Sequence, residues 1–339
     1  MRAVGVTHTS AAPRAYNVLV TSAGRRASLV QAFKRATHAR GARVFAGDAS
    51  ALAPTLYLAD AAFRLPSVGS PDYVPHLLEL VEAHDVGLIV PTIDPELGVL
   101  AAHAAAFAEL GCKALVSHHA FVEISGDKWL TQQAFASHGL DVPQSWTPEE
   151  VQRKGLALPE RLFVKPRDGS ASRDTYRATP ATLPDILTRV PNAIIQEELL
   201  GPEVTIDALL DFEGRALHYV PRIRLRTLAG ESIQGVTIPD DDLGGWLEGL
   251  LAAAAKLGAR GPITLQAFLT ERGPVLIEVN PRFGGGFPLA YAAGGHYPEW
   301  LLALLAGEAV PPRLGEYQRG LYMTRYNVEH FTTELLWEG

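Results

Sequence analysis

The chain has 339 residues, a length that predicts two or three domains rather than one. Apolar residues make up 47% of it, which is ample material for buried cores and argues against disorder. The formal net charge of −7 argues against a dedicated nucleic-acid binder, which would carry a basic patch or stripe.

The composition also bears on compartment and membrane association. Cys112 is the only cysteine, so no intrachain disulfide can form, which favours a reducing, cytoplasmic location. No apolar run approaches the length of a membrane span, so we expect no membrane partner. Residues 1–15 are small and polar without an apolar segment, which predicts a loose tail rather than a signal peptide.

Residues 16–117 alternate between strand and helix patterns. NVLVTSAGRRASLVQAFKRA reads as a strand, a tight turn and a helix, and ARVFAGDAS and DVGLIVPTIDPEL add further strands. This alternation indicates βαβ units and a parallel sheet, and therefore a Rossmann-like α/β domain. Ligands collect at the carboxyl ends of such strands, so Arg25 and Asp94 are candidate substrate contacts.

The first of these loops, SAGRRA, is not a dinucleotide-binding G-x-G-x-x-G motif. It has one glycine and two arginines, Arg25 and Arg26. Guanidinium groups suit a carboxylate or a phosphate, whereas two solvated arginines at the start of a helix are an equally good interpretation. A nicotinamide-dependent oxidoreductase has only this degenerate loop in its favour.

From about residue 118 the pattern changes to consecutive strands, which indicates an α+β region. SGDKWLTQQAFASHGLDVP predicts a helix that is capped by Ser125 or Asp127 and ends by Gly139. PITLQAFLTERGPVLIEVNPRF predicts a hairpin with its turn near residues 271–274. That hairpin would place Gln266 beside Glu278 across the ladder.

VLIEVNPRFGGGF ends the second strand of this hairpin in polar residues. Pro281 disfavours continuation of the strand, and the two-residue period puts Glu278, Asn280 and Arg282 on one face. A carboxylate, an amide oxygen and a guanidinium are the groups from which a site for Mg²⁺ and phosphate is built. The alternative is an ordinary solvated face of an edge strand.

Lys165 lies in an apolar strand and precedes the small-residue loop DGSASRD, residues 168–174. Such a loop lets backbone N–H groups approach phosphate oxygens, and a buried lysine needs an anionic partner. Taken alone, the loop is better interpreted as a flexible surface segment, and Lys165 shifts the balance toward a phosphate site. In VPRIRLRTLAGESIQGVTI, Arg222, Arg224 and Arg226 alternate along a strand, and we hypothesise that one or more of them receives a substrate carboxylate. The alternative is a solvated strand face.

Five motifs in order carry a resemblance: DKWLTQQAF, FVKPRDGSASRD, IIQEELLGPEVTID, LQAFL and IEVNPRFGGG. Together they resemble the ATP-grasp carboxylate ligases, especially the branch similar to the carbamoyl-phosphate synthase large subunit. The resemblance implies a pre-ATP-grasp domain over 16–117 and a two-lobed ATP-grasp domain. It further implies a small lobe over 118–193, a large lobe over 194–312, and a terminal strand or docking segment over 313–339.

The resemblance also implies roles for single residues. Arg282 and Lys165 would be catalytic, and Gln266, Glu278 and Asn280 would hold Mg²⁺, with Mn²⁺ as the alternative metal. Arg25, Asp94, Arg222, Arg224 and Gly285 are the candidate substrate contacts, the last because glycine lets a substrate come close. The positions expected to bind ATP are Lys128, Lys165, Gly169, Ser170, Ser172, Glu197, Glu198, Leu199 and Glu203.

The implied activity is that of an ATP- and Mg²⁺-dependent ligase. It would activate a small-molecule carboxylate, such as an amino acid, as an acyl-phosphate and join it to an amine with release of ADP and phosphate. The alternative is an ATP-binding regulatory or sensor protein with the same fold. Related chains often carry a lysine near Gln234, and this chain does not. His118 and His119 are expected in a loop as structural or solvated residues, and a homodimer is the default expectation.

Overall fold

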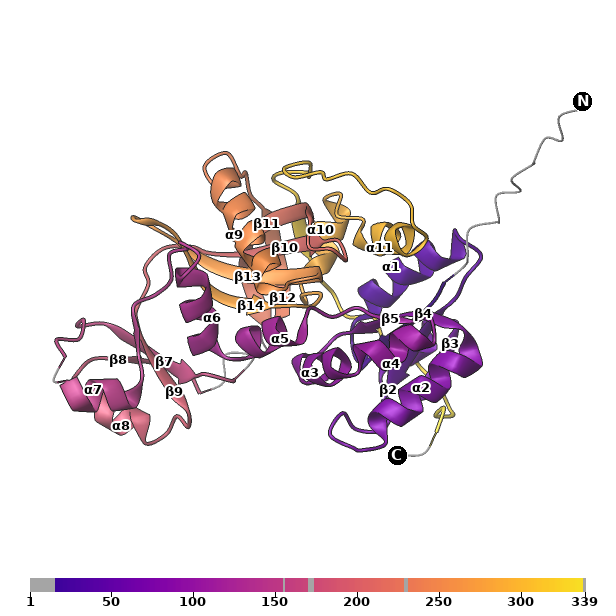
Figure 1. Cartoon of the computed structure of the whole chain (residues 1–339), viewed down its shortest axis with the longest axis horizontal. Coiled ribbons are helices and arrows are strands. Elements are labelled where there is room, and N and C mark those ends of the chain that lie inside the picture. The colour runs from indigo at the N-terminus through magenta and orange to yellow at the C-terminus, as the bar shows by residue number, and fades with distance from the viewer. Residues whose placement is uncertain (1–15, 155, 170–173, 229–230, 338–339) are drawn as a thin grey trace, which may run out of the picture.

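The computed structural model describes residues 16–154, 156–169, 174–228 and 231–337. Within these ranges the strands form three sheets, one parallel and two antiparallel (Figure 1). Within the described ranges, none of the helices combines the length and the apolar character that crossing a lipid bilayer requires.

The N-terminal part is a five-stranded parallel sheet of order β3-β2-β1-β4-β5. Its central strands are apolar and buried on both faces, as helix-covered parallel strands must be. This confirms the predicted Rossmann-like domain. Its strands are β1 (Asn17–Thr21), β2 (Val44–Asp48), β3 (Ala61–Arg64), β4 (Val86–Pro91) and β5 (Lys113–Ala114). Its helices are α1 (Ala27–His38), η1 (Pro54–Tyr57), α2 (Tyr73–His84), α3 (Asp94–Ala102) and α4 (Ala104–Glu109).

A four-stranded antiparallel sheet of order β6-β9-β7-β8 forms the small lobe, with a hydrophobic core of its own. The lobe was expected to end at residue 193, whereas β9 keeps residues 194–197 in this sheet because they pair with β7. Its elements are β6 (Ser145–Trp146), α7 (Pro148–Lys154), β7 (Leu162–Pro166), β8 (Tyr176–Ala178), α8 (Leu183–Leu187) and β9 (Ala193–Glu197).

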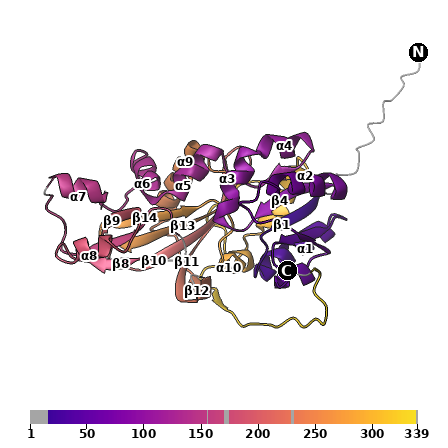
Figure 2. The ribbon, with the colours of Figure 1, turned by 90° about the horizontal axis from the view of Figure 1, so that it is seen from below.

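A six-stranded antiparallel sheet of order β14-β13-β10-β11-β12-β15 forms the large lobe. Helices α5, α6 and α9 lie together on one face of it (Figure 2). Its strands are β10 (Glu203–Leu210), β11 (Ala216–Leu228), β12 (Glu231–Thr237), β13 (Gly261–Thr270), β14 (Gly273–Asn280) and β15 (Tyr322–Thr324). The helices are α5 (His119–Gly126), α6 (Lys128–Ala136), α9 (Gly244–Leu257), α10 (Phe287–Ala292) and α11 (Tyr297–Leu305).

Two local sequence predictions can be compared directly with these elements. The side chain of Asp127 caps α6 by accepting hydrogen bonds from the backbone N–H groups of Trp129 and Leu130, as expected. The expectation that both histidines lie in a loop was wrong for His119, which begins α5, although His118 precedes that helix.

One continuous hydrophobic core joins the N-terminal sheet to the large lobe. It includes Val18 and Phe33 from the parallel sheet and α1, and Leu265 and Phe283 from the large lobe. The rings of Phe33 and Phe283 meet edge to face with centroids 5.8 Å apart. The N-terminal sheet and α1 therefore pack against the large lobe, whereas the small lobe has its own separate core.

Candidate active site

A cavity of about 330 Å³ lies where the small lobe faces the large lobe. Its walls come from β7 and β9 of the small lobe, the connection at residues 198–201, and β10, β13 and β14 of the large lobe. Ten of the residues singled out in the sequence line it: Lys128, Lys165, Gly169, Glu197, Glu198, Leu199, Glu203, Arg224, Gln266 and Glu278.

Lys165 is the buried cation of this cavity. Its side chain is 8% exposed on β7, and its Nζ lies 5.9 Å from the centroid of the Phe163 ring. Burial lowers its pKa to about 8, partly opposed by the nearby carboxylates of Glu278 and Glu203. Among the residues that the structure describes, no hydrogen bond or ion pair reaches this ammonium, so its charge is available to an anion in the cavity.

Lys128 supplies a second cation at the amino end of α6. Its Nζ donates to the backbone carbonyl of Gly169, at the start of the small-residue loop, and to that of Arg167 at 3.4 Å. Arg167 in turn forms an ion pair of 2.6 Å with the helix-capping Asp127. These contacts hold the two lysines close enough that Lys128 further lowers the pKa of Lys165.

The β13–β14 hairpin has the register that the sequence predicts. Gln266 stands directly opposite Glu278, and the strand ends at Asn280, before Pro281. Asn280 Nδ2 donates to Glu278 Oε1 at 3.3 Å, which brings an amide beside the carboxylate. Gln266, Glu278 and Asn280 therefore offer one carboxylate and two amide oxygens, a hard donor set that suits Mg²⁺ when substrate phosphates supply further ligands.

Arg282 lies beyond this strand and reaches the N-terminal domain. Its Nε and Nη2 donate to the two carboxylate oxygens of Asp94, each at 2.7 Å. Asp94 is the first residue of α3, at the carboxyl end of β4. The structure thus joins a predicted catalytic residue to a predicted substrate contact in one bidentate ion pair.

The segment between the two lobes is held by side chains that the sequence did not single out. Arg272, in the hairpin turn, donates to Glu197 Oε1 at 2.6 Å and to Asp141 Oδ2 at 2.8 Å. Glu198 forms an ion pair of 2.7 Å with Arg177. Both acidic side chains are thus engaged by arginines, which leaves the backbone of residues 197–199 as the part that can contact a ligand.

The candidate arginines of β11 have different environments. Arg222 is 2% exposed and its Nε donates to Asp207 at 2.6 Å, while its Nη1 is buried without a hydrogen-bond partner. Arg224 is half-buried and pairs with Glu203, the residue expected to bind ribose. Arg226 is exposed, after an irregularity in the ladder. The three arginines therefore do not form one face of the strand with a shared role.

Several expected site residues lie elsewhere. Arg25 is exposed. The cavity wall does not include Arg25, Asn280 or Arg282. The carbonyl of Gly285 accepts a hydrogen bond from Arg325. The expected flap residues Ser170 and Ser172 lie outside the described residues.

Other lining residues were missed by the sequence reasoning. Phe163 and Phe268 contribute aromatic surface to the cavity, and Arg177 contributes a guanidinium. The two phenylalanines could have been found, because each lies two residues from a predicted site residue, Lys165 or Gln266, and so shares its strand face. Nothing in the local pattern signals Arg177 or Arg272.

Comparison with known proteins agrees with this architecture. Residues 18–115 match the family described as PylC-like, N-terminal domain, and residues 189–328 match the family described as ATP-grasp in the biosynthetic pathway with Ter operon.

The chain is 28% identical over 214 residues to a D-alanine–D-alanine ligase of Mycolicibacterium smegmatis, covering 53% of this chain and 57% of that ligase. A D-alanine–D-alanine ligase of Corynebacterium urealyticum is 29% identical over 182 residues, covering 46% and 50%. The chain thus spans little more than half the length of these relatives.

Solved structures share the fold at lower identity. The biotin carboxylase domain dimer of Hydrogenobacter thermophilus 2-oxoglutarate carboxylase, in complex with MgADP, ADP and bicarbonate, has a TM-score of 0.72 at 17% identity, over 90% of this chain and 73% of that one. An L-amino acid ligase from Bacillus licheniformis has a TM-score of 0.66 at 18% identity, over 86% and 74%. Residues 18–115 are thus similar to PylC-like N-terminal domains and residues 189–328 to ATP-grasp domains, and the solved structures share the fold that the sheets and lobes form.

Proposed function

We propose that the protein is an ATP- and Mg²⁺-dependent ligase that joins a small-molecule carboxylate, of which an amino acid is the leading candidate, to an amine. The observation that carries the proposal is the cavity itself, which Lys128 and the buried Lys165 line together with the Gln266–Glu278 pair. Among the residues that the structure describes, Lys165 has no ion-pair partner. Cations on one wall and oxygen ligands on the other are complementary to a triphosphate and its metal. D-Alanine–D-alanine ligases and an L-amino acid ligase are among the proteins similar to this chain.

In the proposed reaction a carboxylate oxygen of the substrate attacks the γ-phosphorus of ATP, and ADP leaves. The amine nitrogen then attacks the acyl carbon of the resulting acyl-phosphate, and phosphate leaves with loss of a proton from nitrogen. Lys128 and Lys165 would neutralise the phosphates, and Arg282 would stabilise the transferred phosphoryl group. The backbone of residues 197–199 would contact adenine, and Glu203 would bind ribose after release from Arg224.

A divalent cation would be held by Gln266, Glu278 and Asn280, with Mg²⁺ preferred and Mn²⁺ as the alternative. It would supply charge neutralisation between the phosphates. Arg224 is the best placed of the candidate substrate arginines because it lines the cavity, whereas Arg222 is committed to Asp207. A cytoplasmic location and a homodimer, the latter as in the biotin carboxylase domain dimer, complete the proposal.

The test is release of ADP and phosphate from Mg²⁺-ATP with a panel of amino acids, offered singly and in pairs. We expect release that needs one carboxylate and one amine and that disappears with EDTA or in Glu278→Ala. ADP release that persists in Glu278→Ala would refute the assigned metal site. Tight ATP binding without turnover on any pair would instead indicate a nucleotide sensor.

A further inference from the structure

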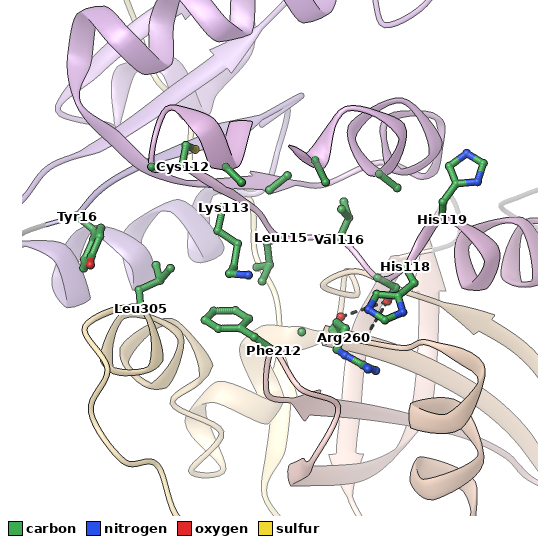
Figure 3. Close-up of a pocket in the computed structure, with 17 residues that line it drawn as sticks. Tyr16, Cys112, Lys113, Leu115, Val116, His118, His119, Phe212, Arg260 and Leu305 are labelled. Carbon is green, nitrogen blue, oxygen red and sulfur yellow. Dashed lines mark hydrogen bonds between the residues drawn. The ribbon is translucent and has the colours of Figure 1, made fainter. Parts of the chain in front are cut away.

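A second cavity, of about 610 Å³, lies outside the space between the two lobes, between the edge strand β5 and the large lobe (Figure 3). One wall is α4 and the chain from Cys112 to His119, which includes β5. The facing wall is Phe212, in the turn after β10, together with Arg260 and Gly261 at the start of β13 and Leu305 of α11. None of these residues belongs to the ATP-grasp cavity described above.

The charge of this second cavity is opposite to that of the whole chain. Lys113, Arg260, His118 and His119 line it, and none of its lining residues is aspartate or glutamate. The chain as a whole carries a formal charge of −7. A concave site whose permanently charged lining residues are Lys113 and Arg260 attracts anions, even in a protein that repels them overall.

The two permanent cations have no acidic partner within the described ranges. Lys113 Nζ lies over the ring of Phe212, 4.5 Å from its centroid. Arg260 donates from Nη1 to the carbonyls of Ala255 (3.2 Å) and Ala259 (2.6 Å), at the carboxyl end of α9. Its Nε is buried without a hydrogen-bond partner. The carbonyls fix the guanidinium in place, but no carboxylate of the described residues neutralises it.

The rest of the wall is apolar. Leu115 and Val116 lie on the β5 side, and Leu305 and Phe212 lie opposite, as Figure 3 shows. A ligand that fits both features has an anionic group and a short apolar body. The guanidinium of Arg260 adds positive charge to the wall, but its Nη1 is engaged by carbonyls and its Nε is buried, so Lys113 is the cation that can contact the anionic group directly.

We propose that this cavity binds a short-chain organic anion, of which a carboxylate is the simplest, with its anionic group at Lys113, where Arg260 adds positive charge, and its chain against Leu115, Leu305 and Phe212. The site is separate from the proposed catalytic cavity, so it does not depend on the ligase assignment.

The experiment is isothermal titration calorimetry of the full chain with three probes of equal chain length: hexanoate, hexanol and hexylamine. We expect hexanoate to bind, and the other two to bind about tenfold more weakly or not at all, because a charged hydrogen bond is worth roughly that factor. Lys113→Glu should weaken hexanoate binding by about tenfold or more. Ala108→Trp, which places an indole in the cavity from α4, should abolish it.

Two control variants separate binding at this site from binding elsewhere on the chain. Lys256→Glu makes the same charge change on the exposed side of α9, outside the cavity wall, and should leave hexanoate binding unchanged. Lys165→Ala removes the buried cation of the other cavity and should also leave it unchanged. Loss of binding in Lys165→Ala but not in Lys113→Glu would place the carboxylate in the catalytic cavity and overturn the proposal. Absence of hexanoate binding to the unmodified chain would also overturn it.

Discussion

Lys165 carries an ammonium group in buried, apolar surroundings that disfavour its charged form. Its neighbour Val164 and its strand partner Ile194 are fully buried, and burial lowers the pKa of the Lys165 ammonium to about 8 from the usual 10.5. The sequence indicated the unusual position, since a lysine in an apolar strand needs an anionic partner. The absence of such a partner among the described residues is what connects this residue to binding rather than to stability.

Replacement of this lysine should therefore stabilise the protein. Below pH 8 the native state holds a buried charge, whereas between pH 8 and 10.5 it sheds a proton that the unfolded chain keeps, so native stability rises with pH across that window. We expect Lys165→Met to raise the free energy of unfolding at pH 7 by up to roughly 3 kcal/mol and to lose ATP binding. Thermal melts from pH 7 to 10.5 should show the difference in stability between Lys165→Met and the unmodified chain becoming smaller as the pH rises. A variant less stable than the unmodified chain at pH 7 would assign the ammonium a structural role.

Gly286, one of the glycines that follow β14, has to be a glycine because of a side chain that is distant in the sequence. A Cβ at Gly286 would lie 2.3 Å from Cζ of Arg222, which is fixed by its buried ion pair with Asp207. Gly286 therefore lacks a side chain because the protein's own guanidinium occupies the space. The sequence prediction that these glycines admit a substrate had no means of detecting this, because the two residues are far apart along the chain.

Gly286→Ala is accordingly expected to destabilise the protein by about 1–3 kcal/mol through overpacking. Gly249→Ala is the matched control: it lies on the exposed side of α9, where a Cβ would meet nothing within 4 Å, and should stabilise by roughly 0.5–1 kcal/mol. Differential scanning calorimetry of both variants compares them. Equal melting temperatures of Gly286→Ala and Gly249→Ala would show that Arg222 can move aside at little cost.

At the scale of the element, the β13–β14 hairpin serves two purposes. Its register sets Gln266 opposite Glu278, which was predictable because alternating apolar runs on either side of a short turn specify a hairpin. Its turn also carries Arg272, which pairs with Glu197 at the end of β9 and with Asp141 before β6. These pairs join positions 75 and 131 residues apart, so no periodicity in the sequence signals them.

Arg272→Met tests whether this turn holds the segment between the lobes. The ion pairs are partly exposed, so we expect a loss of stability of only about 0–1 kcal/mol. Because residues 197–199 line the cavity, we expect ATP affinity to fall by about three- to tenfold, equivalent to roughly 1 kcal/mol of positioning. Arg189→Met, which breaks an exposed ion pair with Asp185 within the small lobe, is the control and should not change the affinity. An unchanged affinity in Arg272→Met would make its pairs purely structural.

At the scale of the whole molecule, the N-terminal sheet and the large lobe share one core, while the small lobe has another. The order of strands and helices was sufficient to predict the α/β and α+β regions, because each class has its own alternation. How the regions meet could not be predicted, since the contacts between them depend on single side chains. Arg282 and Asp94 are the clearest example, because each was assigned a separate role and they are bonded to each other across 188 residues.

Asp94→Asn tests what this contact between domains does. Asparagine keeps the size of the side chain but removes the charge that holds the guanidinium of Arg282 at two points. If the ion pair orients Arg282 toward the transferred phosphoryl group, the variant should lower kcat by about 10–100-fold, the loss typical of a misplaced catalytic group. The KM for ATP should stay within about twofold, because neither residue lines the cavity.

The control is another ion pair between the same two parts of the chain. Arg40, after α1, pairs with Glu308, after α11, at 2.7 Å, and Arg40→Met breaks that pair without touching Arg282. Equal losses of kcat in the two variants would mean that the N-terminal domain matters only for docking. A rise of kcat in Asp94→Asn would mean that Asp94 restrains Arg282 and must release it before the reaction. Selective loss in Asp94→Asn alone makes the N-terminal domain part of the catalytic apparatus, because it then supplies the carboxylate that positions the arginine.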